Sequence, residues 1–311
     1  MKTVFMFPGQ GSQSIGMMSA LISESATAKQ VFLDASEAIE QDLIKIAAEG
    51  PESLINQTAI TQPIVLTASF AMWEVWKQNS NVMPDYVCGH SLGEYTALVA
   101  SGVMTLKEAV RLVHVRGRLM QTAVPEGEGG MAALLGLSDE LVAEACLEAA
   151  QGDVVAPANF NSPGQVVISG GTAALERAVI IAKEKGAKRA AKLPVSVPCH
   201  CDLLKPAGEA LAEEMNKIAF QKPKLPVMQN VNAELSQDIS VLKENLLSHL
   251  YSPVLWSQSI VELVKHDAEV FVECGPGKVL SGLNKRIDKS VKSFAMSDLE
   301  SMTSVIEVLQ A

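Results

Sequence analysis

The sequence has few charged residues and no long apolar run. These two features argue against a disordered chain and against a membrane-spanning protein. Charged residues make up 19% of the 311 residues, below the roughly 25% of an average globular protein. No stretch reaches the length of about 18 apolar residues that a membrane-spanning helix needs. With 48% hydrophobic residues, the chain is expected to fold as one large or two modest globular domains.

Positive charge is also scarce. The chain has 25 Lys and Arg residues against 35 Asp and Glu residues, a formal net charge of -10. A nucleic-acid groove or an anionic membrane surface needs clustered positive charge, so we expect neither nucleic acid nor membrane as the main partner. Any anionic partner would need a local basic patch.

Cysteines are few, odd in number and scattered, which suits a reducing compartment better than a disulfide framework. Cys199-His200-Cys201 resembles a metal cluster, but no second Cys/His pair has the spacing of a zinc site, so we expect packing residues and no metal. The apolar stretch after Met1-Lys2 is interrupted at Pro8-Gly9, too early for a signal peptide. A cytoplasmic protein is therefore expected.

Strands alternate with helices in the first part of the chain. A buried strand at Thr3–Phe7 leads into a glycine-rich loop. The next predicted elements are helices over 62–77, 91–100 and 105–123 and a strand over 86–88. This alternation predicts an α/β fold with a mainly parallel sheet. A last core strand is expected at 270–273.

The pattern changes after the loop at 125–130. Strands are predicted over 131–137, 154–160, 166–169 and 188–195, and helices over 138–150 and 172–185. Their order, βαββαβ, is the ferredoxin-like arrangement. We therefore expect a small domain at 126–197, inserted into a larger domain formed by 1–125 and 198–311.

Gly89-His90-Ser91-Leu92-Gly93 fits the G-x-S-x-G motif, with a predicted strand before it and a predicted helix after it. A serine there sits on a tight turn that exposes its hydroxyl. Ser91 could simply cap the helix, but the context on both sides favours a nucleophile.

A serine nucleophile needs a base, and His200 is the favoured histidine because it follows the inserted domain and would face an interdomain cleft. His114 is expected on a solvated basic face with Lys107, Arg111 and Arg118, and His266 on the surface. His249 stays open as an alternative.

Arg116 lies on the apolar face of its predicted helix, followed by Gly117. A buried guanidinium needs an anion, either a structural carboxylate or the free carboxylate of an acidic substrate. Two backbone donors would complete an acyl-transfer site, and Gln10 and Leu92 are the candidates for this oxyanion hole.

Several segments in this order resemble the malonyl-CoA:acyl carrier protein transacylases of bacterial fatty acid synthesis. They are residues 7–13, 61–63, 89–94, 159–165, 194–198 and 275–280. The resemblance implies a hydrolase-like α/β core with a ferredoxin-like insertion. It also implies a monomer without a permanently bound cofactor, which uses malonyl-CoA as substrate and acyl carrier protein as partner.

The resemblance also assigns roles to residues. Ser91 matches the nucleophile, His200 the base, and Arg116 the residue that holds the malonyl carboxylate. The backbone N–H groups of Gln10 and Leu92 match the oxyanion hole. His249 takes the place of the residue whose carbonyl orients the base, usually a glutamine. Asn159 and Asn161 are expected to line the pocket.

Two other functions are compatible with these residues. A serine hydrolase or thioesterase would use the same serine turn, although no convincing acid completes its triad. A scaffold that binds the carrier without chemistry would not need Ser91, His200 and Arg116 together.

Because acyl carrier protein and CoA are anionic, we expect basic residues to gather near the cleft. The candidates are Lys188, Arg189, Lys192, Lys278, Lys285 and Arg286.

Overall fold

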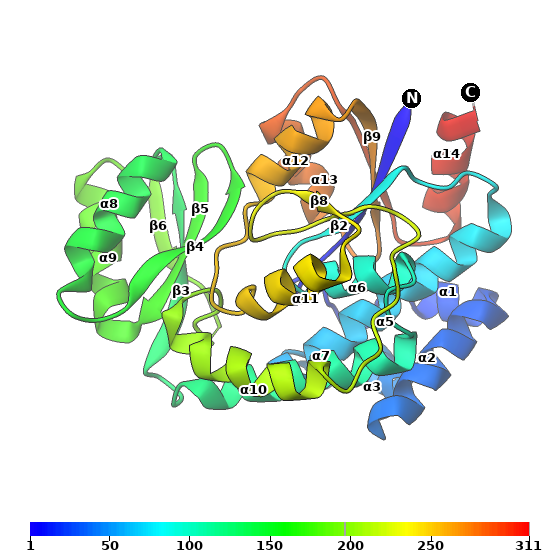
Figure 1. The fold of residues 1–311 in the computed structure, drawn as a ribbon, viewed down its shortest axis with the longest axis horizontal. Helices are drawn as coiled ribbons and strands as arrows, with labels where there is room; N and C mark the ends of the chain where they lie inside the picture. Colours follow the sequence, from blue (N-terminus) through cyan, green and yellow to red (C-terminus); the bar gives the residue numbers. More distant parts are fainter. Residues whose placement is uncertain (196, 311) are drawn as a thin grey trace.

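The computed structural model describes residues 1–195 and 197–310, which form two β-sheets with helices packed around them (Figure 1). Ser196, which belongs to one of the segments that carry the resemblance, lies outside the described residues. The smaller sheet and its two helices stand at one side of the molecule, and both termini lie at the other side (Figure 1).

The larger sheet is mostly parallel. Its strand order is β10-β9-β1-β2-β7-β8, and β8 pairs antiparallel with β7 while the other neighbours are parallel. The strands are β1 (Lys2–Phe7), β2 (Tyr86–Gly89), β7 (Val227–Met228), β8 (Leu235–Ser236), β9 (Ala268–Cys274) and β10 (Lys292–Met296). This topology confirms the predicted α/β class with a mainly parallel sheet.

Helices cover both faces of this sheet, because strands such as β1 carry apolar side chains on both faces. Phe5 and Phe7 point to one face, where they meet Trp73 edge-on, while Val4 and Met6 point to the other. The first face belongs to one apolar core that also contains residues of α1 (Ser19–Glu24), α2 (Ala26–Ile39), α3 (Leu43–Glu49), α4 (Glu52–Ile55), α5 (Thr58–Asn79), α6 (Leu92–Ala100), α7 (Leu106–Ala123), α10 (Lys205–Met215), α11 (Ile239–Ser248) and α14 (Leu299–Gln310). The second packs against α12 (Trp256–Lys265) and α13 (Val279–Ile287). Among the helices of the described residues, none is long and apolar enough to cross a membrane.

The smaller sheet has the predicted βαββαβ order. It consists of β3 (Gly129–Leu135), β4 (Val155–Ser162), β5 (Gln165–Gly171) and β6 (Arg189–Lys192), arranged β4-β5-β3-β6 with antiparallel neighbours. The helices α8 (Asp139–Ala150) and α9 (Thr172–Glu184) cover one face and share a separate apolar core with it. Ser138 caps α8 by accepting the N–H of Leu141. The ferredoxin-like arrangement is therefore confirmed.

Three predicted elements differ from the structure. The helix predicted from residue 62 begins at Thr58 and contains Pro63. The strand predicted over 188–195 ends at Lys192, because Pro194 has no N–H to donate to a ladder. The strand at Ala268–Cys274 is not the last one, since β10 pairs with it at the edge of the sheet. The largely half-buried residues of β10 gave no apolar run to signal a strand.

Candidate active site

Ser91 occupies a sharp turn between β2 and α6. Its φ of 50° and ψ of −107° lie outside the regions that L-residues favour. Both flanking glycines are required by close packing, since a Cβ on Gly93 would lie 2.0 Å from the carbonyl oxygen of Phe7, and one on Gly89 would lie 2.0 Å from the carbonyl group of Gly93. The turn therefore holds α6 directly against β1 and places Ser91 in the wall of a cavity.

His200 lies beside Ser91, with its Nε2 at 2.8 Å from the serine Oγ. Its Nδ1 is 2.8 Å from the carbonyl oxygen of His249 and 3.2 Å from that of Ser252. Carbonyls only accept hydrogen bonds, so Nδ1 carries the proton and Nε2 is free to accept the Ser91 hydroxyl. Burial, followed by the charge of Arg116, lowers the pKa of His200 to about 3. The imidazole is therefore neutral at physiological pH, as a general base requires.

Asn230 and Ser252 contribute to this geometry although no sequence pattern marked them. Asn230 accepts the backbone N–H of Ser91 at 2.8 Å through Oδ1 and donates to the carbonyl of Gly89 at 2.7 Å through Nδ2. It thus clamps the serine turn on both sides of His90. Both residues act on partners more than 50 positions away in the chain, which a local motif cannot reveal.

Arg116 is 1% exposed and lies in the wall of the same cavity. Its Nη1 donates to Oε1 of Gln62 at 2.7 Å, whereas Nε and Nη2 have no partner among the described residues. The guanidinium lies 5.3 Å from the ring centre of Tyr95. Within the described part of the chain no carboxylate forms an ion pair with it. Two buried donors are therefore available to an anion.

Gly117 explains how the arginine reaches this position. A Cβ on Gly117 would lie 2.6 Å from Cα of Ala59 and 2.7 Å from the carbonyl oxygen of Thr58. Helices α5 and α7 therefore approach each other at the residue next to Arg116, which brings Gln62 of α5 within hydrogen-bond distance.

Gln10 and Leu92, the candidate oxyanion donors, both line the cavity. Gln10 follows β1 and Leu92 is the first residue of α6, whose N-terminus carries a partial positive charge. Neither backbone N–H has an acceptor among the described residues. Both donors are therefore free to receive a developing negative charge on an oxygen.

The cavity lies between the two sheets and has a volume of about 590 Å³, within the usual range for small-molecule sites. The larger-sheet part contributes Ser91, His200 and Arg116, and the smaller sheet contributes Met131, Val167, Asn159 and Asn161. Asn161 accepts a hydrogen bond at 2.8 Å from Nε2 of His90 through Oδ1. All eight predicted site residues except His249 line this cavity; His249 is buried behind it.

The prediction for His114 was wrong. It is half-buried, and its Nδ1 donates to the carbonyl oxygen of Ala59 at 2.8 Å. Pro63 has no N–H for that carbonyl, its normal partner four residues back, and His114 supplies the missing donor. Lys107 pairs with Glu37. Arg111 and Arg118 are exposed, so this face of α7 is solvated at both arginines and packs against a neighbouring helix at His114. His266 is exposed, as predicted.

Cys199-His200-Cys201 is packed into the fold. Cys201 is buried and accepts from Oγ of Ser169 at 3.6 Å, while Cys199 lies in the cavity wall. Burial raises the pKa of Cys199 to about 12, so its thiol is neutral. Among the described residues no group of three metal-ligating side chains comes together.

A serine on a sharp turn between a strand and a helix, a neutral histidine base and free oxyanion donors on an α/β sheet are typical of enzymes that carry an acyl group on serine. The chain belongs to the acyl transferase domain family, whose model matches residues 4–306. A malonyl CoA-acyl carrier protein transacylase of Salmonella typhimurium is 47% identical, over 97% of this chain and 98% of the relative. The enzyme of that name from Bacillus subtilis is 43% identical, over 99% and 98%.

Solved structures that resemble this chain carry the same kind of name as these relatives. An acyl carrier protein S-malonyltransferase from Vibrio cholerae superposes with a TM-score of 0.96 at 48% identity, covering 98% of this chain and 100% of that chain. A malonyl-transacylase in complex with a type II PKS acyl-carrier protein has a TM-score of 0.97 at 44% identity, covering 99% and 100%. At these identities the likeness extends beyond the fold to the family.

Proposed function

We propose that this chain is an acyl carrier protein S-malonyltransferase, which moves the malonyl group from malonyl-CoA to the phosphopantetheine thiol of acyl carrier protein. The observation that carries the proposal is Arg116, a buried cation in the cavity of Ser91 and His200, two of whose nitrogens have no partner in the described part of the chain. Those donors fit the free carboxylate that distinguishes malonyl from acetyl. The names of the relatives support the same substrate and partner.

The first half-reaction loads the serine. Nε2 of His200 takes the proton of the Ser91 hydroxyl as Oγ attacks the thioester carbonyl. The carbonyl oxygen becomes an oxyanion that accepts from the N–H groups of Gln10 and Leu92. The tetrahedral intermediate collapses, the C–S bond breaks, and the CoA sulfur leaves with the proton held by His200. A malonyl-Ser91 ester remains.

The second half-reaction reverses the first with a different thiol. His200 removes the proton from the phosphopantetheine thiol, and the sulfur attacks the ester carbonyl of malonyl-Ser91. Collapse of the second intermediate breaks the C–O bond and returns the proton to Ser91. This ping-pong sequence needs no permanently bound cofactor, and malonyl-CoA takes part as substrate.

The transferase is favoured over a thioesterase. The relatives are named as transacylases, and the imidazole of His200 is oriented by two backbone carbonyls and not by a carboxylate. Serine turn, base and arginine are all present, which disfavours a scaffold without chemistry.

We also propose the division of the chain at 126–197, because the core of α8 and α9 draws its residues from this range alone. The cavity would then be an interdomain cleft. The free thiols of Cys88, Cys146, Cys199, Cys201 and Cys274 support a reducing, cytoplasmic location.

Intact-protein mass spectrometry after mixing with malonyl-CoA tests the function. The wild type is expected to gain one malonyl group, and Ser91→Ala none. Adding acyl carrier protein should discharge the adduct much faster than water does. An unmodified wild type, a modified Ser91→Ala, or discharge at equal rates with and without the carrier would contradict the proposal.

A further inference from the structure

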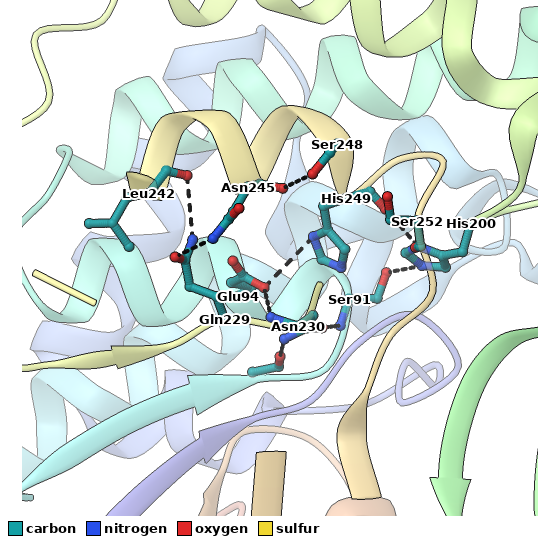
Figure 2. A network of polar contacts seen from close by, with 11 residues as sticks. Ser91, Glu94, His200, Gln229, Asn230, Leu242, Asn245, Ser248, His249 and Ser252 are labelled. Atoms are coloured by element: carbon teal, nitrogen blue, oxygen red, sulfur yellow. Dashed lines mark hydrogen bonds and ion pairs between the residues drawn. The ribbon is translucent and has the colours of Figure 1, made fainter. Parts of the chain in front are cut away.

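A buried carboxyl group lies behind the catalytic pair. Glu94, on the first turn of α6, is 1% exposed. Its Oε2 accepts the backbone N–H of Asn230 at 2.9 Å and lies 3.8 Å from Nδ1 of His249. One carboxyl thus contacts the residue that clamps the serine turn and the residue whose carbonyl orients His200 (Figure 2).

On the serine side, the connection is made of short hydrogen bonds. Asn230 is held by Glu94 through its backbone and holds Ser91 and Gly89 through its side chain, at 2.8 and 2.7 Å. A shift of Glu94 would therefore move Asn230, and with it the turn that carries the nucleophile.

On the histidine side, the imidazole of His249 is fully buried, and neither ring nitrogen has a hydrogen-bond partner among the described residues. Its ring centre is 5.1 Å from that of His200, and its ring lies between Glu94 and His200 (Figure 2). A buried polar group without a partner is costly. Closing the gap to Glu94 by about 1 Å would give His249 a normal hydrogen bond.

The charged and titratable surroundings decide which of the two groups changes protonation. The groups that face Glu94 are Cys88, Tyr95, Arg116 and His249, and those that face His249 are Glu94, His200, Arg116 and His90. Burial raises the pKa of Glu94 to about 7. Burial, with His200 next, lowers the pKa of His249 well below its usual value. Near neutral pH Glu94 titrates while His249 stays uncharged.

We propose that Glu94 and His249 form a hydrogen-bonded pair that positions Ser91 and His200 together and changes state with pH. In the acid state the carboxyl O–H donates to Nδ1 of His249, whose own proton is on Nε2. When Glu94 loses its proton to solvent, the ring proton moves to Nδ1 and donates to the carboxylate. The negative charge then stabilises the imidazolium that forms on His200 as Ser91 is acylated.

The kinetic test rests on the proposed function and measures malonylation of Ser91 in a single turnover at saturating malonyl-CoA, between about pH 5.5 and 8.5. The wild-type rate should rise about fivefold with a midpoint near pH 7, the pKa of Glu94. Glu94→Gln should show no such rise, because the amide does not titrate and His200, with a pKa of about 3, stays neutral throughout. A flat wild-type profile, or the same midpoint in Glu94→Gln, overturns the pair.

Glu273→Gln is the matched control. Glu273 is also a buried carboxyl with a raised pKa, but it accepts from the N–H groups of Leu280 and Ser281, outside the network of Glu94. This variant should keep the wild-type midpoint. A midpoint that disappears in Glu273→Gln would place the titrating group elsewhere and overturn the assignment to Glu94.

A second measurement on the resting protein needs no reaction. In ¹⁵N-histidine-labelled wild type, the NMR signals of His249, assigned with His249→Gln, should report a proton on Nε2 below about pH 7 and on Nδ1 above it. In Glu94→Gln one tautomer should persist. A single tautomer of His249 throughout in the wild type overturns the pair, even if Glu94→Gln does not fold. If malonylation fails while the tautomer changes, the proposed function is wrong and the pair stands.

Discussion

Arg116 has five N–H groups and one hydrogen-bond partner among the described residues, Gln62. Such a guanidinium is costly to bury unless an anion completes its surroundings. His200 differs from Arg116 because both of its ring nitrogens have hydrogen-bond partners, which fix its proton on Nδ1. At the scale of residues, the unpaired nitrogens of Arg116 in the cavity wall indicate where a substrate anion binds, and the two hydrogen-bonded nitrogens of His200 hold the base ready to react.

Arg116→Ala should therefore abolish the preference for malonyl over acetyl substrates. We expect kcat/KM for malonyl-CoA to fall roughly 100-fold, with a change of only a few-fold for acetyl-CoA, measured as acylation of Ser91. Arg118→Ala is the matched control, because Arg118 is exposed on the same helix. An unchanged preference in Arg116→Ala would mean that the arginine is structural.

At the scale of elements, the site depends on helices that approach a strand or another helix unusually closely. Gly93 lets α6 contact β1, and Gly117 lets α7 contact α5. Helix α5 also contains Pro63, which cannot donate a hydrogen bond to the carbonyl of Ala59. His114 of α7 donates to that carbonyl in its place. The catalytic geometry thus depends on close backbone contacts between elements, and these contacts require glycine at positions 93 and 117.

Gly93→Ala is expected to lower the free energy of unfolding by about 3 kcal/mol or more, because its Cβ would overlap the backbone of Phe7. Gly282→Ala on α13 is the control, since nothing lies within 4 Å of its added Cβ. It should raise the free energy of unfolding by about 0.5 kcal/mol. Urea unfolding followed by the fluorescence of Trp73, Trp76 and Trp256 measures both, and equal stabilities would contradict the packing argument.

At the scale of the whole molecule, a net charge of -10 opposes the approach of an anionic carrier. Arg286 donates to Oε1 of Gln165, a residue of the cavity wall, at 2.8 Å, and Lys278 precedes the cavity residue Val279. Lys192, by contrast, is paired with Glu176. The basic residues of α13 and the turn before it are therefore the better candidates for guiding the carrier to the cleft.

Reversing two of these charges, Lys278→Glu with Lys285→Glu, should slow transfer of malonyl to acyl carrier protein by about tenfold at low salt and less at high salt. Acylation by malonyl-CoA should slow less. Lys29→Glu with Lys45→Glu, exposed on α2 and α3, is the control and should leave the ratio of the two rates unchanged. Equal slowing of both half-reactions by the first pair would exclude a role in docking.

Much of the fold could be predicted because it is encoded locally. The βαββαβ order, the helix that begins after Ser138 and the buried strand at Thr3–Phe7 follow from short-range patterns. The elements that were missed lack such a pattern: β10 is mostly half-buried, and the start of α5 depends on His114, which comes from another helix. Their stability comes from neighbours distant in sequence.

By itself the sequence determined the fold class, the acidic character of the chain and the candidates Ser91, His200 and Arg116, because a glycine-flanked serine and an arginine on an apolar face are local features. Only the tertiary structure decided what surrounds them. It placed Gln62 beside Arg116, Asn230 beside Ser91 and Ser252 beside His200, and it gave two nitrogens of Arg116 no partner among the described residues. It also brought Glu94 beside His249. Hydrogen bonds and buried charges depend on distances in space, and those distances exist only once the chain has folded.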